Sequence, residues 1–483
     1  MKSTILELSK KLHSGELTAV ELTEQYISAI ERENPTLNAF VHYTFDQARA
    51  NAAEADKLIK EGKATPLTGI PFTLKDNIAT DGLLTTCCSK ILQGFKPYYD
   101  ATVWSKLKAQ GAVLLGKTNM DEFAMGSTSE TSCYGAPLNP IDKTRVTGGS
   151  SGGVAAAVCA NLAPYGLGSD TGGSIRQPAS FCGIVGFKPS YGAVSRYGLI
   201  AYGSSLDQIG PMTKSVTDAA IIYDAIKGED KHDNTSVATP LTPTKLTGDV
   251  KGIKIGVVKE LTEGVNPEIM EAVNSMISAY QQAGAEVVEI SLPALKTALP
   301  VYYIIACAEA SSNLGRYDGI RYGYRASNYS GLDDMVTKTR SEGFGKEVKK
   351  RIMLGTYVLS SGYFDAYYKK ACLLRAEVEK QFADCFEKCD FIFAPTAPQT
   401  AFPLGYSGGN ATETYLSDVC TVPVNIAGLP SISLPCGKDK KGLPIGLQII
   451  GRKYDDERVL DAAYFAEVNN LCEDIEYNGG VKL

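Results

Sequence analysis

The chain has 483 residues, and its 44% hydrophobic and 21% charged content is that of an ordinary soluble globular protein. Its formal net charge of -6 argues against a protein that binds nucleic acid directly, because binding to the phosphate backbone usually requires a positively charged surface. No apolar run reaches the roughly 18 residues that a bilayer requires, and the first residues lack a signal-peptide core. We therefore expect a cytoplasmic protein without a membrane partner.

Histidine and cysteine do not form the patterns of a metal site or a disulfide framework. The twelve cysteines contain no C-x-x-C pair, and the three histidines are His13, His42 and His232. A structural zinc site needs four such ligands at regular spacing. We expect no metal in this chain, and we interpret most cysteines as small buried apolar side chains.

The first half of the chain predicts helices and strands in alternation. Two helices are expected within residues 1–62, and the one that begins with the capping box Thr18 to Glu21 should stop near Pro35. Residues 69–75 predict a strand that ends at Lys75, before a turn. Further elements are expected as a helix at 101–111, a strand at 112–117, a polar loop at 119–140, a helix at 154–160, a strand at 163–169 and a helix at 218–226.

The second half continues the alternation after a break at residues 228–252, which are charged and then rich in Thr and Pro and predict a linker or a surface excursion. A mostly helical segment at 300–390 could belong to the core or contact other subunits. The remaining expected elements are strands at 253–258, 285–290, 391–395 and 445–451 and helices at 267–284 and 456–469. This order favours an α/β fold, a layered mixed β-sheet core flanked by helices, in one domain over residues 1–483.

Two loops dense in glycine and serine interrupt this pattern, at residues 148–153 (GGSSGG) and 168–178 (GSDTGGSIRQP). Glycine at this density costs conformational entropy that a plain turn does not require. Backbone N–H groups without side chains around them can converge on one anion or carbonyl oxygen. The two loops therefore predict an active site.

Four interpretations of these loops stay open from the residues alone. The phosphate-loop pattern G-x-x-x-x-G-K-[ST] occurs at residues 111–118, but its middle residues are apolar and predict a strand. A hydrolase nucleophile elbow at 148–152 would need a histidine, and the downstream one, His232, lies in a charged loop. The loops could also be tight turns. The fourth interpretation is a serine activated by a neutral lysine, for which Lys75 is the candidate, although a strand-end lysine more often extends to solvent.

Three motifs, at residues 69–77, 148–153 and 168–178, together resemble the amidase signature family in content, order and spacing. The resemblance implies that family's fold and a Ser–Ser–Lys triad. Ser174 would be the nucleophile toward an amide carbonyl, and Ser150 would relay a proton and carry a cis peptide bond. Lys75 would be the base that later helps to protonate the leaving ammonia.

The same resemblance implies how the loop before the nucleophile is used. Asp170 and Arg176 would brace this loop instead of touching substrate. An oxyanion-hole donor typically contributes about 3–4 kcal/mol to the transition state. The donors would be the backbone N–H groups of Thr171, Gly172, Gly173 and Ser174.

Further segments are similar to one branch of this family, the glutamine-hydrolysing subunits of tRNA-dependent amidotransferases. They lie at residues 119–126, 134–140, 316–323, 361–368 and 422–428. The resemblance implies that this chain hydrolyses glutamine and passes ammonia to a partner, the B subunit, which binds tRNA and uses ATP with Mg²⁺. A small C subunit would complete a heterotrimer, and this chain itself would need no cofactor.

Free glutamine needs a cation for its α-carboxylate and an anion for its α-ammonium. By position in the family's motifs, Arg351 and Asp418 are the candidates, with Tyr302 nearby; the alternative for Arg351 is a solvated helix face beside two lysines. Two other functions stay open: a stand-alone amidase that hydrolyses small carboxamides, and an inactive scaffold for partner assembly. The presence of Lys75, Ser150 and Ser174 argues against the scaffold.

Overall fold

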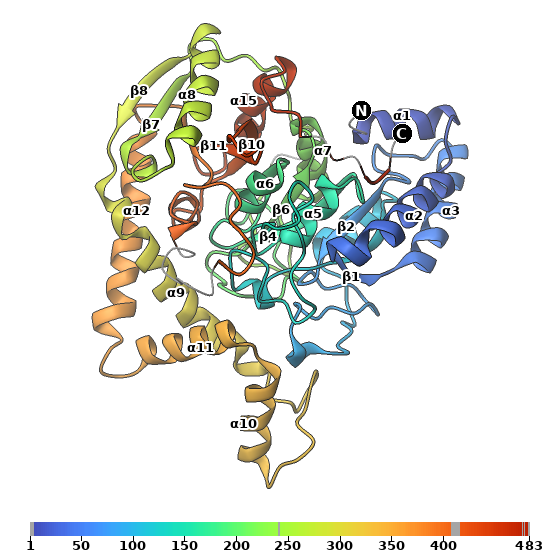
Figure 1. Cartoon of the computed structure of the whole chain (residues 1–483), viewed down its shortest axis with the longest axis vertical. Helices are drawn as coiled ribbons and strands as arrows, with labels where there is room; N and C mark the ends of the chain where they lie inside the picture. The colour runs from blue at the N-terminus through green and yellow to red at the C-terminus, as the bar shows by residue number, and fades with distance from the viewer. Residues whose placement is uncertain (1–3, 240–241, 407–415, 476, 478, 482–483) are drawn as a thin grey trace.

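An eleven-stranded mixed sheet forms the centre of the protein (Figure 1). The computed structural model describes residues 4–239, 242–406, 416–475, 477 and 479–481. In spatial order the strands are β1 (Phe40–Tyr43), β3 (Val113–Thr118), β2 (Pro71–Lys75), β4 (Tyr165–Asp170), β6 (Gln208–Thr213), β5 (Val185–Lys188), β10 (Ser431–Lys438), β11 (Pro444–Ile450), β9 (Phe391–Pro395), β7 (Lys254–Val258) and β8 (Glu286–Ile290). β2 is parallel to β3 and β4, and β7 is parallel to β8 and β9, whereas the other neighbours are antiparallel. The predicted layered mixed sheet is confirmed.

Helices flank the sheet, and α1, α2 and α3 gather at its β1 end (Figure 1). The α-helices described are α1 (Ile5–Ser14), α2 (Ala19–Leu37), α3 (Phe45–Lys60), α4 (Thr102–Ala109), α5 (Gly152–Cys159), α6 (Arg176–Cys182), α7 (Val216–Ile226), α8 (Pro267–Gln282), α9 (Ala298–Asn313), α10 (Leu332–Gly343), α11 (Lys346–Leu359), α12 (Lys370–Cys385), α14 (Val422–Ile426) and α15 (Asp456–Val468). Over the chain as described here, no helix combines the length and apolar character needed to cross a membrane.

The start of α2 follows the sequence prediction, but its end does not. The Thr18 side chain accepts the Glu21 N–H, and the Glu21 carboxylate accepts the Thr18 N–H, so the capping box is formed. The helix passes through Pro35 to Leu37 instead of stopping at the proline. Pro35 removes only one backbone donor near the helix end, and the left-handed Asn38 closes the helix with its N–H on the Asn34 carbonyl.

The segment between α7 and β7 contains no helix or strand in its described residues, which are 227–239 and 242–253. Strands from both sides of this segment nevertheless lie in one sheet, because β5 pairs with β10. The main hydrophobic cluster also crosses this boundary and contains, for example, Phe187 and Ile432. The core is thus built from both halves of the chain.

The mostly helical segment after residue 298 has two different faces. Val348, Arg351 and Val358 of α11 are buried, whereas Met353 is 72% exposed on the same helix. Leu373 of α12 is 67% exposed. α10 extends away from the rest of the protein (Figure 1). The inner face of α11 therefore belongs to the core, and its outer face carries exposed apolar side chains.

Candidate active site

The two glycine–serine loops meet at one edge of the central sheet. β2 and β4 are parallel neighbours, so their carboxyl ends, Lys75 and Asp170, lie on the same side. Ser150 precedes α5, Ser174 precedes α6, and the Ser151 N–H donates to the Ser174 carbonyl at 3.2 Å. Segments far apart in the sequence are thereby joined into one site.

Lys75 and Ser150 form a direct hydrogen bond. The Lys75 ammonium nitrogen lies 2.7 Å from Ser150 Oγ, and it also contacts Ser169 Oγ at 3.0 Å and the Ser169 carbonyl at 3.2 Å. Lys75 is fully buried, with an exposed fraction of 0%. Burial lowers the pKa of Lys75 to about 7, although nearby carboxylates oppose this shift. A lysine with such a pKa is partly neutral at neutral pH and can accept a proton.

The two serines are both buried but differ slightly in exposure. Ser150 is completely buried, whereas Ser174 is 7% exposed. The peptide bond between Gly149 and Ser150 is cis, as the resemblance implies. The buried serine contacts the lysine, and the more accessible one precedes α6.

The loop from Thr171 to Gly173 is held by contacts on several sides. The Thr171 hydroxyl donates to Asp207 at 2.7 Å, and the Thr421 hydroxyl donates to the Gly172 carbonyl at 2.7 Å. The Gly173 N–H donates to Asp170 Oδ1 at 2.8 Å, so this donor is already occupied. This contact departs from the expectation that Gly173 contributes its N–H to the oxyanion hole, and it leaves Thr171 and Gly172, with Ser174, as the candidates.

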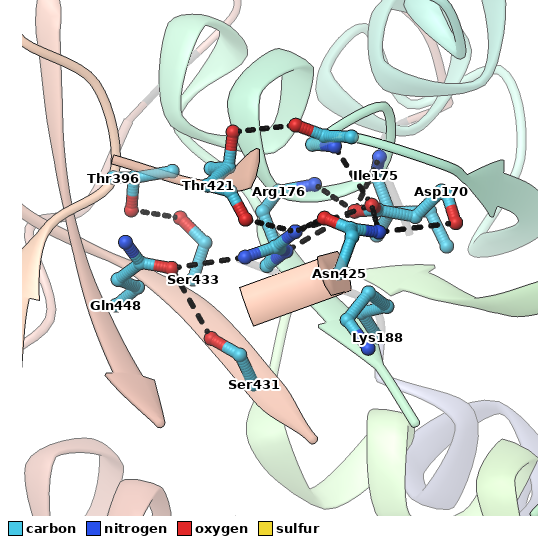
Figure 2. Close-up of polar contacts among 12 residues, drawn as sticks. Asp170, Ile175, Arg176, Lys188, Thr396, Thr421, Asn425, Ser431, Ser433 and Gln448 are labelled. Atoms are coloured by element: carbon cyan, nitrogen blue, oxygen red, sulfur yellow. Dashed lines mark hydrogen bonds and ion pairs between the residues drawn. The ribbon is translucent and has the colours of Figure 1, made fainter. Parts of the chain in front are cut away.

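A buried ion pair between Asp170 and Arg176 braces this loop (Figure 2). Arg176 Nε lies 3.1 Å from Asp170 Oδ2, and Nη2 lies 3.2 Å from Oδ1. Arg176 also donates to Asn425 Oδ1 at 2.6 Å and to Gln448 Oε1 at 3.1 Å. Burial raises the pKa of Asp170, but Arg176 and further cationic and hydrogen-bond partners outweigh it and bring the pKa to about 2. Asp170 is therefore ionised, and this pair ties the loop to α14 and β11.

Replacing Arg176 with methionine is expected to lower the free energy of unfolding by about 3–5 kcal/mol, because Asp170 would remain as a buried, unpaired charge. Chemical denaturation measures this loss. Arg458→Met is the matched control, since Arg458 is half-exposed and pairs with Asp390 and Asp455 at the surface. Its loss should be no more than about 1 kcal/mol. Equal losses in the two variants would contradict the bracing role of Arg176.

The three residues expected to bind glutamine lie around the same loop. A Cβ on Gly172 would lie 2.7 Å from the Tyr302 hydroxyl, so the tyrosine ring contacts the loop directly. The backbone carbonyl of Asp418 accepts the Thr421 N–H, and its carboxylate accepts a hydrogen bond from Ser127. These contacts place both Tyr302 and Asp418 next to Gly172 and the segment that anchors it.

Arg351 acts electrostatically on both Tyr302 and Asp418 and is not a solvated residue. It is only 4% exposed, and it donates from Nε to Glu347 at 2.8 Å and from Nη1 to the Tyr202 hydroxyl at 2.5 Å. Burial raises the pKa of Asp418 to about 7, against the lowering effect of Ser127 and Arg351. Arg351 is therefore close enough to act on Asp418 electrostatically.

The phosphate-loop and nucleophile-elbow interpretations of the motifs do not fit the structure. Residues 113–118 form β3, and the Lys117 ammonium is buried against Thr80 and Thr85, so no phosphate loop exists there. The His232 ring stacks on Tyr197 at 4.7 Å, with its backbone N–H on Asp230. It makes none of the contacts that a catalytic triad with Ser150 would require.

Several residues of this site were not assigned a role from the sequence. The Asp121 N–H donates to the Ser150 carbonyl at 3.2 Å. The available signals were the length of its polar loop and the similarity of residues 119–126 to one branch of the family. Ser169 is a residue of the second motif and contacts Lys75. Asp207 and Thr421 come from segments without any local signal.

Comparison with known proteins extends this result to the whole chain. Residues 21–460 match the Amidase family. The A subunit of the glutamyl-tRNA(Gln) amidotransferase of Thermoanaerobacter pseudethanolicus is 53% identical over 483 residues, 99% of each chain. The protein of that name from Lachnospira eligens is 54% identical over 96% of this chain and 97% of its own.

Solved structures agree with these sequence matches. The A subunit of the glutamyl-tRNA(Gln) amidotransferase of Thermotoga maritima has a TM-score of 0.78 at 40% identity and covers 96% of this chain and 94% of its own. A bacterial aryl acylamidase of the amidase signature family has a TM-score of 0.85 at 26% identity, with 97% and 96% covered. With the family matched over most of its length and Lys75 bound to Ser150 beside Ser174, the chain belongs to the amidase signature family.

Proposed function

We propose that this chain is the glutamine-hydrolysing subunit of a glutamyl-tRNA(Gln) amidotransferase, which releases ammonia for the conversion of Glu-tRNA(Gln) to Gln-tRNA(Gln). The observation that carries the chemistry is the 2.7 Å hydrogen bond between Lys75 Nζ and Ser150 Oγ, in a loop that contacts Ser174. The choice of reaction is supported by relatives of that name at 53–54% identity over 96–99% of the chain.

In the proposed reaction, Ser174 Oγ attacks the side-chain amide carbon of glutamine. Its proton passes to Ser150, and the Ser150 proton passes to Lys75 Nζ. The tetrahedral intermediate's oxyanion accepts hydrogen bonds from backbone N–H groups of the Thr171–Gly172 loop and Ser174. When the C–N bond breaks, the proton returns through Ser150 to the nitrogen, which leaves as ammonia. Water then hydrolyses the Ser174 ester by the same relay and releases glutamate.

Recognition of a free amino acid is assigned to the charged pair beside the loop. Arg351 would bind the α-carboxylate of glutamine, and Asp418 would bind its α-ammonium, with Tyr302 against the substrate. Both charged side chains are buried, and a buried charge is stabilised when it is paired. The ammonium of bound glutamine would also keep Asp418 ionised, since an adjacent cation lowers the pKa of a carboxyl group.

Arg351→Met should raise the KM for glutamine by about 10- to 100-fold, the effect of losing a charge-assisted hydrogen bond to the α-carboxylate. Steady-state kinetics on glutamine and on butyramide measure this. Butyramide has the amide but no α-carboxylate, so its KM should stay within about twofold. If both substrates lose affinity equally, Arg351 supports the site in general and does not recognise the carboxylate.

The partners are proposed from the same reaction. The B subunit would bind tRNA and hold ATP with Mg²⁺, a small C subunit would complete a heterotrimer, and this chain would need no cofactor of its own. The relatives' designation as one subunit of an amidotransferase supports membership of such a complex. We also propose a cytoplasmic location, since all twelve cysteines are free thiols, as is usual in a reducing compartment.

Ammonia release from glutamine and from butyramide, by the chain with and without its partner subunits, tests the proposed function. We expect hydrolysis of glutamine in the assembled complex and a strong preference for glutamine over butyramide. Rapid butyramide hydrolysis by the chain alone would instead indicate a stand-alone amidase for small carboxamides. Absence of glutamine hydrolysis in both preparations would overturn the proposal.

A further inference from the structure

The proton that Lys75 accepts creates a cation in a fully buried position. The titratable groups that raise the pKa of Lys75 most are the carboxyl groups of Asp121, Asp170 and Asp207 and the thiol of Cys87. Burying an ammonium ion is costly unless an anion stands close by. The site therefore requires a counter-ion, and these groups are the candidates.

Two of the three carboxylates are already committed to other groups. Asp170 is neutralised by the guanidinium of Arg176, with both of its oxygens engaged (Figure 2). Asp207 accepts the Thr171 hydroxyl at 2.7 Å and the N–H groups of Tyr202 at 2.9 Å and Gly203 at 3.1 Å. The Cys87 thiol is uncharged, because burial raises its pKa well above the ordinary value.

Asp121 is different, because it forms no ion pair with another side chain in the described part of the chain. Burial raises the pKa of its carboxyl group, and Lys75 is among the groups that oppose this rise. Its Oδ1 accepts the Thr131 hydroxyl at 2.9 Å and the Thr131 N–H at 3.5 Å, and its Oδ2 is buried without a hydrogen bond within the described part of the chain. Its backbone N–H donates to the carbonyl of Ser150, the residue whose hydroxyl contacts Lys75. Asp121 thus bonds to the backbone of Ser150, and Lys75 bonds to its side chain.

The chain also makes room for this carboxylate. A Cβ on Gly126 would lie 2.3 Å from Asp121 Oδ1, and a Cβ on Gly149 would lie 2.1 Å from Oδ2. Any larger residue at either position would collide with the carboxyl group. The first glycine belongs to the polar loop and the second to the cis peptide before Ser150, so the carboxyl group is enclosed at the catalytic loop itself.

We propose that Asp121 is the counter-ion of Lys75, a positioning residue whose buried carboxylate stabilises the ammonium formed when Lys75 takes the proton relayed from Ser174. No atom of Asp121 exchanges with the substrate. The proton moves from Ser174 to Ser150 and from Ser150 to Lys75, and Asp121 balances the resulting charge. This role rests on the proposed function, since it requires Lys75 to be the base.

The test is the pH dependence of kcat/KM for glutamine in the complex assembled from the full chain and its partner subunits. Asp121→Asn removes the charge at nearly constant size, so Lys75 should lose its proton at lower pH. We expect the acid limb, the part of the pH profile where kcat/KM rises with pH, to move to lower pH by about one unit. The plateau should fall by about tenfold, because the base becomes weaker.

A second variant and a matched control separate this effect from a loss of structure. Asp121→Ser is smaller than the native residue, so it cannot collide with Gly126 or Gly149, and it should move the limb in the same direction. Asp218→Asn removes another fully buried carboxylate, one that accepts the Ile5 N–H and does not face Lys75. It should leave the limb in place.

An unmoved acid limb in both Asp121 variants, with activity reduced or not, would overturn the counter-ion role. The outcome for the proposed function is read separately, from Lys75→Met. If that variant keeps both its activity and its acid limb, Lys75 is not the base. The proposed mechanism is then wrong, whatever the Asp121 variants show. If Lys75→Met is inactive and Asp121→Asn moves the limb downward, both are supported.

Discussion

Ser174→Ala should lower kcat for glutamine hydrolysis by about 10³- to 10⁶-fold, the range found when the nucleophile of a serine hydrolase is removed. The covalent intermediate cannot form without Oγ, so only the donors of the loop and substrate binding remain. Ser174 lies two residues before α6, and alanine fits any backbone conformation that serine adopts there. The unfolding midpoint should therefore change little.

The neighbouring serine supplies the control for this prediction. Ser151 is also buried in the catalytic loops, but its hydroxyl donates to the Ser169 carbonyl at 3.1 Å and has a structural partner. Ser151→Ala should reduce kcat by about tenfold at most, as expected for the loss of the ordinary hydrogen bonds between its hydroxyl and the Ser169 backbone. A Ser174→Ala enzyme with more than a tenth of the native kcat would contradict the nucleophile assignment.

Lys75→Met should reduce kcat/KM by about 10³-fold or more, because neither serine could then transfer its proton to a base. In the native enzyme the direction in which activity changes with pH follows from one fact: only neutral Lys75 can act as the base. Below its pKa of about 7, Lys75 is protonated and cannot accept a proton. Activity should therefore rise with pH through about 7, and the residual activity of Lys75→Met should lack this rise.

Lys188 is the matched control for this variant. It is also fully buried, and burial lowers its pKa to about 7 as well. Its ammonium donates to the carbonyls of Pro189 at 2.9 Å and Leu429 at 2.5 Å, away from Ser150. Lys188→Met should keep the rise through pH 7 even if it lowers stability. If Lys188→Met loses that rise and Lys75→Met keeps it, Lys188 is the base and Lys75 is not.

Local sequence patterns predicted the elements that local forces form. The capping box of α2 and the apolar periodicity of α8 depend on residues three and four positions apart. The strands at 71–75 and 113–118 begin with apolar residues and end at a polar one before a turn, and they lie within a residue or two of their predicted bounds. The motifs around Lys75, Ser150 and Ser174 are equally local, which is why their chemistry could be inferred before the fold.

Four strands and two helices, α6 and α14, were missed because their stability comes from distant partners. β6 contains Gly210 and Pro211, which disfavour a strand, yet it pairs along its whole length with β4. β1, β5 and β10 are formed by pairing with β3, β6 and β11. α6 begins at Arg176, shortly after the glycine pair at 172–173, and contains Pro178, so its sequence predicted a loop. Only the completed sheet shows that these segments are ordered elements.

The sequence by itself determined the chemical types that the site contains: a lysine at a strand end, two serines in glycine-rich loops and no histidine in a suitable motif. It could not determine what surrounds them, because burial and distance depend on segments up to hundreds of residues apart. The tertiary structure places Lys75 2.7 Å from Ser150, buries it so that its pKa falls, and engages the Gly173 N–H with Asp170. It also buries Arg351 and brings Asp121 against Ser150, since both positions arise from packing between remote parts of the chain.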